Sequence, residues 1–142
     1  MPEKKTTSYP KEKINILFLE NISDLAMKQF IDSGYVNVKK RTGALSEEEL
    51  IKEIKNVHIL GIRSKTQVTE NVLAAALKLQ AIGCFCIGVN QVNLQAATDH
   101  GVAVFNAPYS NTRSVAELVI GASILLVRKI IDKILQPTRE HG

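Results

Sequence analysis

Arg63 and Lys65 are the residues of this sequence best placed to bind an anion. The stretch Gly-Ile-Arg-Ser-Lys-Thr at 61–66 sets them beside the hydroxyls of Ser64 and Thr66, directly after an apolar run. A guanidinium fork and an ammonium group next to hydroxyls suit a carboxylate or a phosphate ester. The alternative interpretation is a solvated basic loop without a ligand.

Two further segments could contribute to the same site. Gly83 and Gly88 enclose an apolar stretch within 83–93, which is typical of a tight turn and a close backbone approach. Residues 106–113 precede a long apolar segment, and Ser114 predicts a capping box there, with Glu117 three residues later. A helix start of this kind favours an anion, but capping alone also explains the pattern.

The sequence contains no other complete nucleotide-binding, metal-binding or catalytic motif. It contains neither Gly-x-Gly-x-x-Gly nor a P-loop, so we expect no complete dinucleotide site. Cys84 and Cys86 lack the additional ligands that zinc requires, and we expect them to be reduced core residues. His58 lies in an apolar run and is expected in the core or at a sheet edge. We therefore predict no metal site and no catalytic triad.

Strands and helices are predicted to alternate along the chain. Apolar runs and one alternating stretch predict five strands, at 14–19, 35–38, 57–62, 79–82 and 102–105. Capping residues and helical spacing predict helices that begin at Ser23, Ser46 and Thr69, a short helix at 94–98 and a long one at 114–131.

This alternation predicts the α/β class, with a doubly wound parallel sheet covered by helices on both faces. Functional loops of such sheets gather at the carboxyl ends of the strands, which is where the segments 63–66, 83–93 and 106–113 fall. The long helix at 114–131 is apolar on most sides and therefore requires more than one neighbour.

The net charge of +4 is confined to the two ends of the chain, because residues 14–126 carry ten basic and ten acidic side chains. A nucleic-acid-binding surface would concentrate basic charge, so we expect no nucleic-acid partner. The longest apolar stretch is interrupted by Glu117 and is too short to cross a membrane. Reduced cysteines and a polar start at 1–13 predict a cytoplasmic protein.

Three stretches of the sequence resemble a known family. They are Gly-Ile-Arg-Ser-Lys-Thr at 61–66, Ala-Ile-Gly-Cys-Phe-Cys-Ile-Gly-Val-Asn-Gln-Val-Asn-Leu at 81–94, and Phe-Asn-Ala-Pro-Tyr-Ser-Asn-Thr-Arg-Ser-Val-Ala-Glu-Leu-Val-Ile-Gly at 105–121. Together they closely resemble the bacterial phosphoglycerate dehydrogenases, a branch of the D-isomer-specific 2-hydroxyacid dehydrogenase family. The likeness extends from Ile14 to Lys133.

The resemblance implies a domain organisation. Residues 14–113 would form the family's flavodoxin-like substrate-binding domain, and 114–133 the helix that crosses between domains. A disordered polar tail is expected at 1–13 and an atypical tail at 134–142, with the dinucleotide-binding domain absent.

The resemblance also implies a function. Family members oxidise 3-phosphoglycerate to 3-phosphohydroxypyruvate with NAD, in serine biosynthesis. Arg63, Ser64 and Lys65 would hold the phosphorylated substrate. Ile87, Gly88 and Asn106 would face the NAD cofactor.

The family's catalytic Arg, Glu and His have no matching positions in this sequence. Because hydride transfer needs both the cofactor and a base, we expect the chain to be inactive alone. The alternative is a module that binds a phosphorylated acid, or a regulatory partner of an intact paralogue. The apolar helix at 114–131 is expected to favour a homodimer or another association.

The last nine residues, 134–142, do not resemble the family. One permitted set of codons for them, read one base earlier, gives the family-like Asn-Leu-Ala-Ala-His-Glu-Arg-Thr-Trp. We therefore interpret this tail as the product of a frameshift near Lys133, with deliberate shortening of the chain as the rival explanation. The downstream DNA decides between them.

Overall fold

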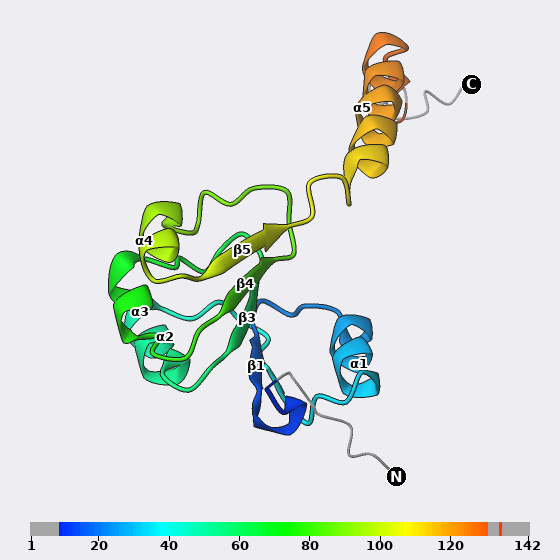
Figure 1. Ribbon diagram of the computed structural model, residues 1–142. Coiled ribbons are helices and arrows are strands. Elements are labelled where there is room, and N and C mark those ends of the chain that lie inside the picture. Colours follow the sequence, from blue (N-terminus) through cyan, green and yellow to red (C-terminus); the bar gives the residue numbers. More distant parts are fainter. Residues whose placement is uncertain (1–8, 131–133, 135–142) are drawn as a thin grey trace, which may run out of the picture. The chain divides into compact units, whose positions relative to one another are not determined.

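The computed structural model describes residues 9–130 and 134. The chain divides into two units, with the boundary between Pro108 and Tyr109. Among the described residues, the first unit contains a parallel sheet with its helices, and the second contains one long helix (Figure 1). In chain order the elements are η1 (Lys11–Lys13), β1 (Asn15–Phe18), α1 (Asp24–Asp32), β2 (Asn37–Lys40), α2 (Glu47–Ile54), β3 (Ile59–Ile62), α3 (Glu70–Ala75), β4 (Ala81–Cys84), α4 (Leu94–Asp99), β5 (Ala103–Asn106) and α5 (Thr112–Val127).

All five strands run parallel, in the order β2-β1-β3-β4-β5. This is the flavodoxin-like order of a doubly wound sheet, so the predicted fold class is confirmed. The register places Phe18, Gly61, Gly83 and Phe105 side by side in one row across β1, β3, β4 and β5. That row lies next to the carboxyl edge of the sheet, where the candidate loops begin.

The strand order explains which face each helix covers. The chain steps from β1 to β2 in one direction and from β2 onward through β3, β4 and β5 in the other. Crossovers between parallel strands are right-handed in about 98% of cases, so a reversal of direction moves the connecting helix to the opposite face. Accordingly, α1 lies on one face and α2, α3 and α4 lie on the other (Figure 1).

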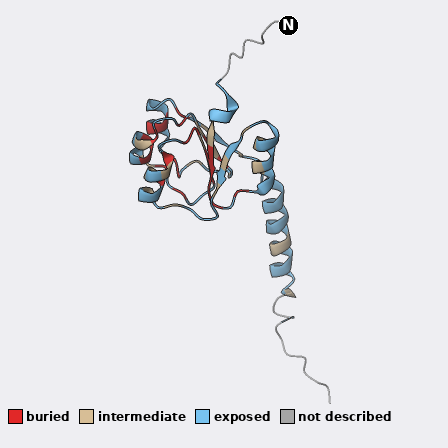
Figure 2. Cartoon of the chain, turned by 90° about the horizontal axis from the view of Figure 1, so that it is seen from below, coloured by how far each residue is buried: buried red, intermediate tan, exposed pale blue. Residues whose placement is uncertain are grey.

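The face under α2, α3 and α4 holds the main core. Its strand residues include Leu60, Ile62 and Ile82, none of which exposes any surface. Buried apolar residues from all three helices pack against them, namely Leu50, Ile54, Val72, Leu73, Ala96 and Ala97. Figure 2 shows the buried residues gathered between the strands and these helices. Each fully buried Leu or Ile contributes about 1.5–3 kcal/mol relative to an exposed one.

The opposite face is covered only in part by the first unit. Phe18 is buried under α1 and meets the ring of Phe30 edge to face, with 5.5 Å between ring centroids. Phe105, in the same row, is 63% exposed, and Phe85 is 40% exposed. Parallel sheets are usually buried on both faces, so the part of this face over β4 and β5 is an uncovered apolar surface of the first unit.

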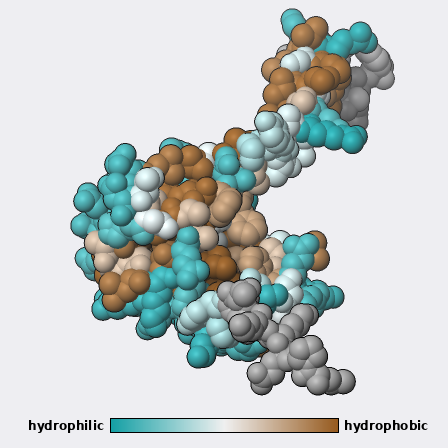
Figure 3. All heavy atoms as spheres, viewed as in Figure 1, coloured by the Kyte–Doolittle hydropathy of each residue, from teal (hydrophilic) through white to brown (hydrophobic). Residues whose placement is uncertain are grey.

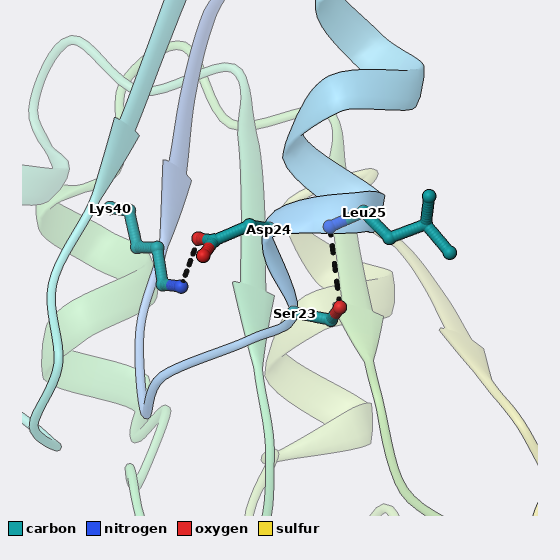
Figure 4. A network of polar contacts seen from close by, with 4 residues as sticks. All are labelled: Ser23, Asp24, Leu25 and Lys40. Carbon is teal, nitrogen blue, oxygen red and sulfur yellow. Dashed lines mark hydrogen bonds and ion pairs between the residues drawn. The ribbon is translucent and has the colours of Figure 1, made fainter.

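Local capping fixes where the helices begin, as the sequence predicts. Ser23 Oγ accepts the backbone N–H of Leu25, and the Lys40 ammonium pairs with the Asp24 carboxylate, which joins the start of α1 to the end of β2 (Figure 4). Ser46 forms a complete capping box with Glu49 at the start of α2. The predicted N-cap at Thr69 is also present, at the start of α3.

Three strands begin two residues later than predicted, at Asn37, Ile59 and Ala81, because residues assigned to them still serve helix ends. β2 starts at Asn37 rather than at residue 35, since Gly34 (φ 94°) and Tyr35 close α1 in a Schellman motif. The Gly34 N–H bonds Ile31 O, and the Tyr35 N–H bonds Phe30 O. β4 likewise starts at 81 rather than 79.

The predicted disordered tail at 1–13 is wrong for its last residues, because Lys11–Lys13 form the turn η1. The Lys11 ammonium donates to Ser33 O at 2.7 Å, which joins this turn to the end of α1. Residues 1–8 lie outside the described part of the chain.

The second unit corrects the prediction for the long helix. α5 starts at Thr112 and ends at Val127, because Lys129 adopts a left-handed conformation (φ 50°) that no helix continues. The capping box predicted at Ser114 is wrong, since Glu117 accepts instead from Arg113 Nε at 2.7 Å. The predicted helix end at 131 and the tail at 135–142 lie outside the described residues.

Apolar side chains cover much of the face of α5 that is visible in Figure 3. The exposed ones include Leu118, Val119, Ile120, Ile124, Leu126 and Val127. Even so, within the described ranges, no helix combines the length and apolar character that crossing a membrane requires.

Candidate functional site

The candidate site lies where the direction of the sheet reverses. In a doubly wound sheet, the loops after the two strands at this point diverge, and ligands bind in the crevice between them. In this sheet the reversal falls between β1 and β3, which are neighbours. A cavity of about 310 Å³ opens at their carboxyl ends, and its lining residues are Glu20, Asn21, Thr42, Gly43, Ala44, Arg63, Ser64 and Lys65.

All three predicted substrate residues line this cavity. Arg63, Ser64 and Lys65 follow the last residue of β3 and are exposed. Neither cation forms an ion pair with any acidic residue in the described part of the chain. Two cations therefore remain available at the mouth of the crevice, which suits an anionic ligand.

A larger cavity of about 590 Å³ lies along β1, β2 and α2 but is less suited to an anion. Its lining includes Arg41 and Glu53, which neutralise each other across 2.7 Å. Lys39 also lines the larger cavity and forms no ion pair among the described residues. We prefer the smaller cavity because two such cations line it and because it lies at the strand ends.

Glu20 is a site residue that the sequence analysis missed. Its carboxylate Oε1 accepts the backbone N–H groups of Thr66 at 2.8 Å and Arg63 at 3.2 Å, and its Oε2 accepts that of Lys65 at 2.9 Å. Glu20 directly follows an apolar strand, which was the available signal. Only the pairing of β1 with β3, however, brings it to this loop.

The three backbone hydrogen bonds control the ionisation of Glu20. Burial opposes the charged form, but the hydrogen bonds from Thr66, Lys65 and Arg63 outweigh it and hold the pKa of Glu20 below its ordinary value. The Thr66 hydroxyl acts in the same direction, although its oxygen makes no well-formed hydrogen bond within the described residues. Glu20 is therefore a buried carboxylate that stays charged at neutral pH.

Hydrogen bonds also tie the loops after β3, β4 and β5 together. The buried Gln91 side chain donates from Nε2 to Arg63 O at 2.6 Å. Asn106 Nδ2 donates to Ile87 O at 2.7 Å, which joins two of the residues predicted to face the cofactor. Gly88 belongs to the same turn, where an added Cβ would come within 2.8 Å of Asn90 Oδ1. The predicted gathering of these loops at one edge is confirmed.

Cys84 and His58 are buried, as predicted, whereas the core prediction for Cys86 is wrong, because Cys86 is only partly buried. Cys84 and Cys86 are free thiols, and burial together with the nearby Cys86 and Glu20 raises the pKa of Cys84 to about 11. His58 is buried and accepts the Asn15 N–H on Nδ1 at 3.0 Å, and burial lowers its pKa. Its predicted core role is confirmed. Within the described residues, no group of three acidic, Cys or His side chains is placed to hold a metal ion.

Comparison with known proteins identifies the family. The chain belongs to the D-isomer specific 2-hydroxyacid dehydrogenases, because the model of that family's catalytic domain matches residues 16–138. The resemblance stated from the loop motifs is thus confirmed, and the match extends beyond Lys133, where the likeness was expected to end.

The closely related proteins share one activity in their names. The chain is 54% identical over 128 residues to the D-3-phosphoglycerate dehydrogenase of Dictyostelium discoideum, across 90% of this chain and 31% of that protein. It is 51% identical over 123 residues to the D-3-phosphoglycerate dehydrogenase of Escherichia coli strain K12, across 87% of this chain and 30% of that protein. The chain therefore spans less than one third of the length of these relatives.

A solved structure supports the same fold. The NAD+-bound 3-phosphoglycerate dehydrogenase of Entamoeba histolytica superposes with a TM-score of 0.64 at 22% identity. The match covers 79% of this chain and 39% of that one.

Proposed function

We propose that the chain forms the substrate side of a D-3-phosphoglycerate dehydrogenase and binds 3-phosphoglycerate. The observation that carries the proposal is the cavity at the β1–β3 reversal, which is lined by two cations without ion pairs among the described residues. The names of the relatives support the choice of substrate.

Each of the three residues has a distinct part in this proposal. The Arg63 guanidinium can donate two parallel hydrogen bonds to phosphate oxygens, and Lys65 supplies a compact positive charge. The Ser64 hydroxyl can donate a further hydrogen bond, since it has no partner among the described residues. Glu20 already engages three of the four backbone N–H groups of this loop, which leaves the side chains and the Ser64 N–H to hold the ligand.

NAD fits the residues of this chain only at one edge. In the family, the cofactor accepts the hydride. Here Ile87, Gly88 and Asn106 would border it, but the Asn106 amide is bonded to Ile87 O, and the sequence has no glycine-rich fingerprint for the pyrophosphate. We therefore propose that the isolated chain binds the phosphorylated acid as a module without transferring hydride. Free thiols at Cys84 and Cys86 support a cytoplasmic setting.

A second part of the proposal concerns association. α5 exposes apolar side chains around its circumference, including Leu118 at 71% and Val127 at 81%. A helix of this kind is usually buried by neighbours. We propose that it mediates association with a second copy or with an intact paralogue.

Thermal unfolding of the chain with added ligands tests the proposed function. We expect 3-phosphoglycerate to raise the unfolding temperature, and D-glycerate, which lacks the phosphate, to have little effect. Arg63→Ala and Lys65→Ala should each weaken binding about tenfold or more, because each removes a charge-assisted hydrogen bond. Lys28→Ala, an exposed cation outside the cavity lining, is the matched control.

Several outcomes would contradict these proposals. Equal stabilisation by D-glycerate, or none by 3-phosphoglycerate, would contradict a phosphate site. Oxidation of NADH by the isolated chain with 3-phosphohydroxypyruvate would contradict an inactive module. Sedimentation of the same samples tests association, and a strictly monomeric species at high concentration would count against it.

A further inference from the structure

Glu20 is the only acidic residue among those that line the cavity at the strand ends. A carboxylate beside a proposed phosphate site would ordinarily repel the ligand. Its surroundings show a different arrangement, because its two oxygens face backbone N–H groups of the loop that carries the cations.

The backbone at Glu20 is bent to make this arrangement. Glu20 and Asn21 both adopt left-handed conformations, with φ values of 57° and 53°. Non-glycine residues seldom take this conformation unless the surrounding structure holds them there. Hydrogen bonds from the Glu20 N–H to Gly43 O and from the Asn21 N–H to Arg41 O supply that restraint. The turn that follows β1 is thus held by backbone hydrogen bonds to residues 41 and 43 and by the hydrogen bonds of the Glu20 carboxylate to the loop after β3.

The loop after β3 wraps around the Glu20 carboxylate. Three of its four N–H groups, at Arg63, Lys65 and Thr66, converge on the two oxygens, as they would on a bound anion. Glu20 is 8% exposed, so solvent is largely excluded from these bonds. The carboxylate takes the place that a phosphate would occupy in a backbone nest.

The two cationic side chains of the loop are not involved in this interaction. Within the described chain, Glu20 forms no ion pair with Arg63 or Lys65. Glu20 therefore holds the loop through the backbone N–H groups of the loop, and it forms no ion pair with either cation. The fixed backbone also restricts where those side chains begin, which reduces the ordering needed when a ligand binds.

We propose that Glu20 is a positioning residue that locks the 63–66 backbone so that Arg63 and Lys65 present their charges to a phosphorylated acid. This inference rests on the proposed function for its ligand but not for its effect on the loop. The two can therefore be tested separately.

Hydrogen exchange of the ligand-free chain tests the effect on the loop. In Glu20→Gln, an NH₂ group replaces one acceptor oxygen and faces N–H donors. We expect the amides of Arg63, Lys65 and Thr66 to exchange about tenfold faster. The matched control Glu53→Gln, at an acid outside this cavity lining, should leave these amides unchanged.

Ligand titration of the same variants tests the consequence. We expect Glu20→Gln to weaken 3-phosphoglycerate binding about tenfold, although it removes a negative charge beside an anion site. A merely electrostatic role for Glu20 predicts the opposite, tighter binding in Glu20→Gln.

A pH titration of the unmodified chain avoids the risk that a variant fails to fold. The amide signals of Arg63, Lys65 and Thr66 should shift together at one midpoint below 4.5, the ordinary pKa of Glu, because the bonds form to the charged carboxylate. The charged or titratable groups near Glu20 are Arg63 and Lys65 on the same loop and Cys84 on β4, while Arg41 is paired with Glu53. The pKa of the Cys84 thiol, about 11, lies far above that range.

The outcomes separate the two proposals. Unchanged exchange in Glu20→Gln, or three amides that titrate at different midpoints, would overturn the positioning role whatever the ligand result. Unchanged or tighter binding in Glu20→Gln, with 3-phosphoglycerate bound by the unmodified chain, would overturn it while the proposed function stands. If the unmodified chain binds no 3-phosphoglycerate but the exchange effect is present, the proposed function fails and the control of the loop by Glu20 stands.

Discussion

The two faces of the sheet are built from the same five strands but packed very differently. One face lies under α2, α3 and α4 and consists of buried residues, mostly Leu, Ile, Val and Ala. The other carries α1 over β1, while Gly83, Ala103 and Phe105 follow on β4 and β5, and no helix among the described residues of the first unit lies above them. The difference follows from topology, because only the β1-to-β2 step runs in the direction that places a helix on that face.

This contrast shows that hydrophobic side chains alone do not define the core. Phe18 and Phe105 stand in one row on one face, yet the first is 1% exposed and the second 63% exposed. Their positions relative to α1 account for the difference. The free energy of unfolding should therefore depend strongly on the Phe18 side of the row, under α1, and hardly at all on Phe105.

The largest expected effect comes from truncating the two phenylalanines. We expect Phe18→Ala to lower the free energy of unfolding by about 3–5 kcal/mol, since it leaves a cavity under α1. Phe105→Ala should change it by about 0.5 kcal/mol or less, because its ring is mostly in water. Urea unfolding of both variants measures the difference. Similar losses of unfolding free energy in the two variants would show that the Phe105 ring is also packed, which would contradict the difference between the two parts of this face.

Gly61 and Gly83 lie between Phe18 and Phe105 in this row, and substituting them should change the free energy of unfolding by a smaller amount. An added Cβ at Gly61 would come within 2.3 Å of Phe18 Cδ1, so Gly61→Ala should destabilise the fold by about 1–3 kcal/mol. At Gly83 the nearest atom is Phe85 Cε2 at 3.4 Å, on a side chain that is partly free to move. Gly83→Ala should change stability by less than about 1 kcal/mol, with a gain from the less flexible unfolded chain. A reversed order would mean that the uncovered part of the face is the more tightly packed one.

The smallest effect concerns thiol reactivity on the covered face. Cys84 is 2% exposed and has a pKa of about 11, so little thiolate forms at pH 8. We expect Ellman's reagent to modify Cys86 readily and Cys84 only after unfolding, with Cys86→Ser as the control that removes the fast phase. Rapid modification of both thiols would indicate that the covered face opens locally.

Sequence patterns were sufficient wherever the determining interaction is local. The helix starts at Ser23, Ser46 and Thr69 all depend on residues within a few positions of one another. The Arg63–Lys65 loop was also identifiable, because its residue types and its place after a strand both appear in sequence.

The remaining features depend on contacts between distant residues. Nothing local to Glu20 shows that its carboxylate meets Thr66, because that contact requires β1 to pair with β3. The Phe18 ring over Gly61 has the same origin. The capping box at Ser114 failed for the opposite reason: the local pattern is present, but Asn111 accepts the Val115 N–H and the helix begins before the pattern does.

The central position of β1 has a consequence for synthesis of the chain. Among the described strands, β1 is the first to leave the ribosome, yet both of its partners, β2 and β3, lie further along the sequence. At translation rates of about 5–20 residues per second, Ile16 waits several seconds before Ile59 exists to pair with it. During that interval a strand made for the centre of a sheet has both edges open, and it would be a natural binding segment for chaperones on the nascent chain.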